Sequence, residues 1–133
     1  MGLYLFRRDN TEEYKCCEVC GKPNSEAHHI VFRSEAPYMK NISINKIYLC
    51  AEHHRGDESP HKSKEVDLQY KRELQAKLNK MFNQSYYTTK DIKNILQTTE
   101  TEAWKITKTL QRYKEGFARE DIVRRCMGGK MYD

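Results

Sequence analysis

The chain has 133 residues, of which 38% are hydrophobic and 32% are charged, and its formal net charge is +5. This length allows one compact domain or two very small ones with a modest core, and modules of this size commonly need a metal to stabilise them. The positive charge favours a polyanionic partner, and a basic surface that serves only solubility is about as probable on charge alone. No apolar run is long enough for a membrane span, and Met1–Phe6 is too short for a signal peptide, so we expect a cytoplasmic protein.

The first sixteen residues carry a short apolar patch, Leu3–Phe6, which predicts a strand or packing arm. Arg7 and Arg8 follow it and are better explained as solvated flanking residues than as phosphate contacts. The chain contains five cysteines, an odd number, which in a reducing compartment fits metal ligation better than disulfides.

Cysteine and histidine are concentrated between positions 16 and 61. Cys17 and Cys20 are separated by two residues, and Cys50 and His53 repeat that spacing, so two short turns can each direct two ligands to one tetrahedral zinc ion. Cys16 competes with Cys17 as a ligand, but only Cys17 has the correct spacing to Cys20. We therefore predict a structural zinc site with three sulfur ligands and one nitrogen ligand.

The other histidines of this stretch have no role in that zinc site: they are His28, His29, His54 and His61. Imidazole takes up a proton near neutral pH and also coordinates divalent metals. A cluster of histidines beyond those needed for structure therefore indicates catalysis.

The order Cys-x2-Cys, His-His-Ile, Asn, Leu-Cys-x2-His-His resembles the HNH endonucleases, over about a third of the chain. The resemblance implies a ββα-metal core within an α+β fold. It also implies His29 as general base, His28 and His54 as ligands of a catalytic metal, and Asn45 as support for the loop that holds the base.

The chain departs from the HNH pattern in two places. The second knuckle of the family usually reads Cys-x2-Cys-His, whereas this chain has His53 at the second cysteine position. The family often has a last His or Asn four residues after the metal histidine, where this chain has Glu58; the nearest later histidine is His61, which becomes the candidate third ligand.

The residues around the histidine pair predict a β-hairpin. His28–Phe32 is rich in β-branched and aromatic residues, and Ile42–Leu49 forms the second apolar run, with Asn45 in or just before the strand. Arg33 follows the first strand and is a candidate for holding the scissile phosphate, or else an ordinary loop arginine.

A long amphipathic helix is predicted from about Pro60 to Phe82, because a proline suits the first turn and apolar residues recur every four positions. We interpret this helix as core packing or as a connector between domains. The predicted domains are a zinc-stapled nuclease domain over 1–82 and a small all-α domain over 86–133.

Three short helices are predicted in the second domain. Thr88 or Thr89 caps the first, and Thr99 with Glu102 forms a capping box for the second, which we expect over Glu100–Tyr113. The third ends at Gly128. The set resembles a helix-turn-helix DNA reader of the excisionase or MerR-like kind; a helical bundle that packs on the nuclease or mediates dimers is the alternative.

In the helix-turn-helix interpretation the second helix enters the major groove and presents Lys105, Lys108 and Arg112. Trp104 can stack on a base, but a lone tryptophan at helical spacing is more often a core residue. Cys126 is expected to be buried.

Together these patterns predict a metal-dependent HNH DNA endonuclease acting on double-stranded DNA, with structural Zn and a catalytic Mg, Mn, Ni or Zn ion. A non-catalytic, zinc-stabilised DNA-binding protein is the main alternative, and an interaction adaptor is a weaker one. Proteins that join these two modules resemble those of phages and other bacterial mobile elements, acting in homing, packaging or restriction. A homodimer would explain double-strand cuts, but the sequence does not demonstrate one.

Overall fold

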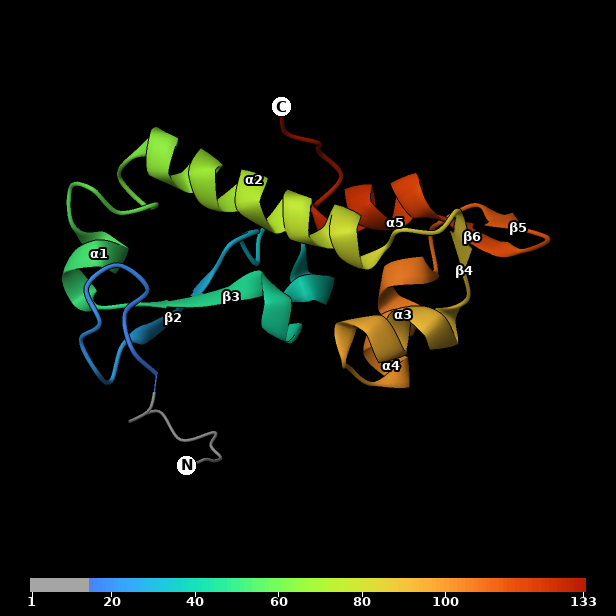
Figure 1. Cartoon of the computed structure of the whole chain (residues 1–133), viewed down its shortest axis with the longest axis horizontal. Helices are drawn as coiled ribbons and strands as arrows, with labels where there is room; N and C mark the ends of the chain where they lie inside the picture. Colours follow the sequence, from blue (N-terminus) through green and yellow to red (C-terminus); the bar gives the residue numbers. More distant parts are fainter. Residues whose placement is uncertain (1–14) are drawn as a thin grey trace. The chain divides into compact units, whose positions relative to one another are not determined.

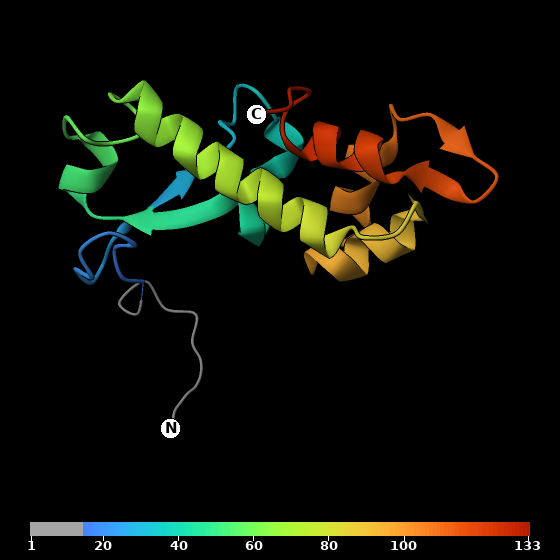
Figure 2. The same cartoon turned by 45° about the horizontal axis from the view of Figure 1, so that its top comes forward.

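The computed structural model describes residues 15–133, and the predicted N-terminal patch with Arg7 and Arg8 lies outside this range. The described chain is α+β, with five α-helices and two small sheets (Figures 1 and 2). Between residues 15 and 133, no helix combines the length and the apolar character needed to cross a lipid bilayer.

The chain divides into two compact units. Unit 1 contains the described residues up to His28 together with Ile47–Asp67, and unit 2 contains His29–Lys46 together with Leu68–Asp133. These divisions differ from the predicted domains, which were separated only once, after Phe82. The segment after the histidine pair and most of the long helix belong to the same unit as the C-terminal residues.

Unit 1 contains all but one residue of each strand of the pair β2 (Glu26–His29) and β3 (Lys46–Leu49), followed by α1 (Ala51–Arg55). The predicted first strand, His28–Phe32, is misplaced, because the observed strand begins and ends earlier. Beyond it the Val31 N–H donates to the Asn45 side chain, and the chain turns at Phe32, whose carbonyl accepts from Ala36 N–H.

The observed second strand, β3, is shorter than the predicted run Ile42–Leu49. Ser43–Asn45 forms a 3-10 turn, η3, and a second such turn, η2, covers Pro37–Met39. Asn45 therefore lies immediately before β3, as predicted.

The long helix α2 spans Lys64–Met81 and begins later than predicted. Pro60 lies in a turn instead, in which Ser63 N–H donates to the Ser59 carbonyl at 2.7 Å. Ser63 then starts the helix, since its hydroxyl accepts from Val66 N–H at 3.3 Å and its carbonyl accepts from Asp67 N–H at 3.0 Å.

The core of unit 2 is formed by one face of α2 together with the C-terminal helices. Its fully buried side chains include Met39, Ile42, Leu74, Leu78, Phe82, Ile92, Leu96, Ile106, Ile122 and Val123. Cys126 is buried too, as predicted.

The C-terminal part of unit 2 is not all-α, which corrects the predicted class of this segment. Its elements are, in order, β4 (Tyr86–Tyr87), α3 (Thr89–Leu96), α4 (Glu100–Thr107), β5 (Arg112–Tyr113), β6 (Gly116–Ala118) and α5 (Arg119–Cys126). The strands form an antiparallel sheet in the order β4-β6-β5. Position 116 of this sheet cannot accommodate a side chain, because the φ of Gly116 is +127° and a Cβ would lie 2.5 Å from the Tyr87 carbonyl oxygen.

The predicted caps of the first two helices are present. Thr88 forms a capping box with Asp91 at the start of α3. At the start of α4 the Thr99 hydroxyl accepts from Glu102 N–H at 3.1 Å, which is only half of the capping box predicted there, and Glu102 Oε2 accepts from Asn41 instead. The predicted continuation of α4 to Tyr113 is wrong. Arg125 donates to the carbonyls of Lys105 and Ile106, both at 3.0 Å, and so satisfies groups that the next helical turn would otherwise use.

Candidate functional site

Three cysteines and one histidine of unit 1 converge on one point. The ligand atoms of Cys17, Cys20, Cys50 and His53 all lie within 4.8 Å of one another. Cys20 Sγ is 3.8 Å from Cys50 Sγ, and His53 Nδ1 is 3.5 Å from Cys17 Sγ and 3.3 Å from Cys50 Sγ. A tetrahedral ion with bonds of about 2.3 Å to sulfur requires sulfur-sulfur separations of about 3.8 Å. The group could therefore hold a metal ion, and its members are those predicted.

Two local turns bring these ligands together. In the first, Gly21 N–H donates to the Cys17 carbonyl at 2.9 Å, and Val19 N–H points at Cys17 Sγ at 3.4 Å. Gly21 has a φ of +81°, which favours glycine. In the second, Cys50 occupies the N-cap of α1, so that one helical turn carries His53 back toward it.

The electrostatic environment favours the thiolate at two of the three cysteines of this cluster, Cys17 and Cys50. At Cys20 the Lys22 N–H lowers the pKa, but burial and the Cys17 and Cys50 sulfurs outweigh it and raise the pKa. Burial opposes ionisation of Cys17, but the backbone N–H groups of Cys50, Cys20 and Val19 outweigh it and lower the pKa of Cys17 to about 6. The N–H of His53 lowers the pKa of Cys50. The Cys17 and Cys50 sulfurs raise the pKa of the His53 ring. Since metal ligation requires deprotonated ligands, a cation that bound here would replace protons.

Three further histidines of unit 1 form a second cluster, which we call the histidine cluster: His28, His54 and His61. Their ligand nitrogens also lie within 4.8 Å of one another. The ring centroids are 5.1 Å apart for His28 and His54, 4.9 Å for His28 and His61, and 4.8 Å for His54 and His61. His28 comes from β2, His54 from α1 and His61 from the turn before α2. The structure thus brings His61 together with the two ligands that the resemblance implied.

Glu26 orients one ring of the histidine cluster. Its Oε1 lies 2.7 Å from Nδ1 of His54, and Nε2 of His54 lies 3.1 Å from Nε2 of His61. The His54 ring, and next the Arg55 guanidinium, lower the pKa of Glu26. A carboxylate that accepts from one ring nitrogen fixes the tautomer and increases the basicity of the other nitrogen, as in many metal sites. Sequence reasoning missed Glu26, although residues two apart on a strand share a face and Glu26 precedes His28 by two.

His29 is the last residue of β2 and belongs to unit 2. Its Nε2 lies 3.0 Å from the Lys40 carbonyl oxygen, which only accepts, so Nε2 carries the proton and Nδ1 is the acceptor. Burial lowers the pKa of His29, the Lys40 carbonyl opposes this, and the charges of Arg33 and Lys46 lower the pKa further. These effects together favour the neutral form of the ring.

Asn45 is fully buried in unit 2, and its side chain holds the backbone of the segment that follows His29. Its Oδ1 accepts from Val31 N–H at 2.8 Å, and its Nδ2 donates to the carbonyls of Val31 and Met39 at 3.1 and 3.3 Å. Met39 directly precedes Lys40, whose carbonyl accepts from His29. Asn45 thus stabilises the backbone that orients this ring.

The predicted DNA-contacting residues all lie in unit 2, but on different elements. Arg33 is exposed in a turn, Lys105 lies on α4 with its Nζ 3.7 Å from Glu102, and Lys108 follows the end of α4. Arg112 lies on β5, so a single helix does not carry all three C-terminal cations. Trp104 is 55% exposed, which contradicts its prediction as a core residue, and the Lys108 ammonium lies 5.1 Å from its ring centroid.

Comparison of the chain with protein-family models, with curated proteins and with solved structures finds no match.

Proposed function

We propose that this chain is a metal-dependent endonuclease of the HNH type, which hydrolyses phosphodiester bonds in double-stranded DNA. The histidine cluster is the observation that carries the proposal. Its three nitrogens converge with a carboxylate behind one of them, and the sequence position directly after its buried ligand His28 is His29. Further support comes from the succession β2, β3, α1, which is the order of elements in a ββα-metal core.

The donor set of the histidine cluster fits a divalent cation. Neutral imidazoles bind Zn, Ni, Mn and related ions, and the Glu26–His54 contact is the outer-sphere arrangement that such ligands use. His28, His54 and His61 would hold the ion. When bound, a divalent cation supplies positive charge against the oxygen that leaves phosphorus.

In this mechanism His29 is the general base. With its Nε2 proton donated to the Lys40 carbonyl, Nδ1 is free to accept a proton from the water that attacks phosphorus. Burial lowers the pKa of His29 and so favours the form in which this nitrogen is unprotonated. Asn45 acts as a positioning residue, because it holds Met39 and so the backbone that carries the Lys40 carbonyl.

The group formed by Cys17, Cys20, Cys50 and His53, which we call the four-ligand cluster, has a structural role in this proposal. Three thiolates and one imidazole suit Zn, whose structural sites are four-coordinate and closed. The cluster links the turn at Cys17 to the start of α1 at Cys50. With a core as small as that of unit 1, such a link contributes directly to folding.

The test is cleavage of supercoiled plasmid with Mg, Mn or Ni, comparing the wild type with His29→Ala and His28→Ala. We expect the wild type to nick or linearise the plasmid. His29→Ala should lose cleavage yet bind as much metal as the wild type, whereas His28→Ala should lose cleavage together with the metal of the histidine cluster. Equal cutting by His29→Ala and the wild type would show that His29 is not the base.

A second candidate function is a non-catalytic, zinc-stabilised DNA-binding protein. It is favoured by the four-ligand cluster, which needs no chemistry, and by the exposed pair of Trp104 and Lys108. Retention of metal and of DNA binding by all three proteins, without cleavage under any metal, would select this function over the first.

A further inference from the structure

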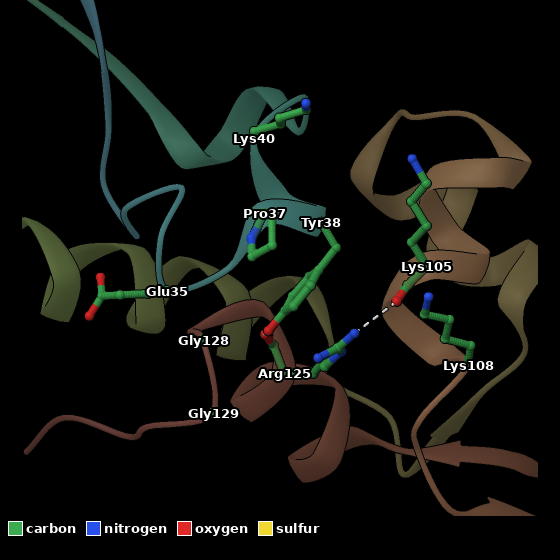
Figure 3. Close-up of a pocket in the computed structure, with 9 residues that line it drawn as sticks. All are labelled: Glu35, Pro37, Tyr38, Lys40, Lys105, Lys108, Arg125, Gly128 and Gly129. Atoms are coloured by element: carbon green, nitrogen blue, oxygen red, sulfur yellow. Dashed lines mark hydrogen bonds between the residues drawn. The ribbon is translucent and has the colours of Figure 1, made fainter.

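Unit 2 contains a pocket that neither metal cluster uses, and we call it the basic pocket. It has a volume of about 580 Å³ and is lined by residues that include Lys40, Lys105, Lys108, Arg125, Tyr38 and Glu35 (Figure 3). This volume lies within the range of pockets that take one small organic ligand. The basic pocket is therefore large enough for a single nucleotide.

Positive charge dominates the lining of the basic pocket. Four of the lining side chains are cationic, and the one carboxylate among them, Glu35, lies 3.3 Å from the Lys71 ammonium. That ion pair offsets the negative charge of Glu35, and Glu102 in turn lies 3.7 Å from the Lys105 ammonium and offsets part of its charge. With Lys40, Lys108 and Arg125 also in the lining, a bound anion still meets a net positive field. Lys40 comes from the end of η2 and Lys105 from α4, and their chains extend on either side of the open space (Figure 3).

Arg125 and Tyr38 form a rigid floor for this pocket. The guanidinium carbon of Arg125 lies 3.6 Å from the centroid of the Tyr38 ring, and the Tyr38 hydroxyl donates to the Arg125 carbonyl at 2.6 Å. Two further bonds hold the guanidinium on the carbonyls of Lys105 and Ile106. Because these side chains are already ordered, a ligand loses little free energy in ordering them on binding.

The basic pocket is linked to the candidate base through one residue. The Lys40 side chain lines the pocket, and the Lys40 carbonyl oxygen accepts a hydrogen bond from His29 Nε2 at 3.0 Å. A strand that reaches His29 can therefore place a neighbouring nucleotide beside Lys40. The Tyr38 ring in the floor and the neighbouring Pro37 offer apolar contact to a sugar or base, which a bare phosphate would not use.

We propose that the basic pocket binds one 5′-phosphorylated nucleotide unit of a single strand, with Lys40 and Lys105 on its phosphate. The inference rests on the proposed function for the identity of the strand, and it adds a second subsite to it. Binding is measured without cleavage, so failure of the nuclease proposal leaves this result intact, and the reverse also holds.

The probe is a 5′-phosphorylated thymidine trinucleotide with a 3′ fluorescent label, titrated by anisotropy onto zinc-loaded protein without added catalytic metal. Lys40→Ala/Lys105→Ala is compared with Lys90→Ala/Lys114→Ala, which removes the same charge from lysines that do not line the pocket. We expect the first double variant to bind about tenfold more weakly and the second to change less than about twofold. The slope of log K against log salt should fall by about 0.7 for each phosphate that the first double variant no longer neutralises.

Competitors distinguish the sources of the phosphate. Thymidine 5′-monophosphate should displace the probe at about tenfold higher concentration than the unlabelled trinucleotide, and thymidine should not displace it. Equal losses of affinity in the two double variants would show that the probe binds to the general positive charge of the surface and would overturn the proposal. Inorganic phosphate competing as well as the monophosphate would overturn nucleotide recognition, and a monophosphate as tight as the trinucleotide would overturn the assignment to a strand.

Discussion

Replacing Asn45 by alanine should cost unit 2 a large part of its stability. The side chain is fully buried and makes three hydrogen bonds, to the N–H and carbonyl of Val31 and to the Met39 carbonyl. Each such bond contributes about 1 kcal/mol net, and a buried group left without a partner costs about 1–3 kcal/mol. Since Val31 and Met39 are themselves buried, we expect Asn45→Ala to lower the free energy of unfolding by about 3–4 kcal/mol.

The matched control is Asn41→Ala, in the same connection between β2 and β3. Asn41 is exposed and makes one hydrogen bond, to Glu102 at 3.0 Å, so its loss should cost no more than about 0.5 kcal/mol. Urea unfolding followed by far-UV circular dichroism, with both variants metal-saturated, measures the difference. If Asn45→Ala unfolded within about 1 kcal/mol of Asn41→Ala, the assignment of Asn45 as the support of this loop would be refuted.

Three other perturbations test the two clusters and the core. Cys50→Ser should reduce the zinc retained after dialysis, measured by elemental analysis, because the four-ligand cluster then lacks one thiolate; retention equal to the wild type would exclude that ligand set. Glu26→Gln should weaken Ni binding at the histidine cluster about 10–100-fold by calorimetry, because the amide is a poorer acceptor for the His54 ring, and an unchanged affinity would remove Glu26 from the site. Burial raises the pKa of Cys126 to about 12, so its contribution to stability is fully present below the unfolded pKa near 9 and is lost as pH rises toward 12. Between about pH 8 and pH 10 the free energy of unfolding of the wild type should fall by about 1 kcal/mol more than that of Cys126→Ala, and parallel pH profiles would contradict this.

The four-ligand cluster and the N-caps of α3 and α4 could be predicted from the sequence because both features are encoded locally. The spacing of Cys17 with Cys20, and of Cys50 with His53, needs only one turn of chain to direct two ligands the same way. Thr88 and Thr99 likewise cap the helices that follow them through bonds to residues three positions away. These features persist whatever the rest of the chain does.

The outcome at the histidine cluster depended on both levels. The resemblance identified His28 and His54 as metal ligands, whereas the spacing of His61 from His54 does not match the family pattern. Only the turn over residues 57–62, which delays the start of α2, brings His61 to the other two rings. Glu26 was missed for a similar reason, since its partner His54 lies 28 residues away in sequence.

The C-terminal part shows what the tertiary structure alone decided. Helical periodicity continues beyond Thr107, but Arg125 takes the carbonyls at the end of α4, and Arg112–Tyr113 pairs with Gly116–Phe117. Trp104 is left on the surface, and Lys105 lines a pocket with Arg125. Local propensity is worth only tenths of a kcal/mol per residue, so contacts from distant residues override it. The sequence by itself therefore determined the spacing of the four-ligand cluster and the N-caps of α3 and α4. The start of α2, the ends of helices, the sheet and the basic pocket arose only from tertiary packing.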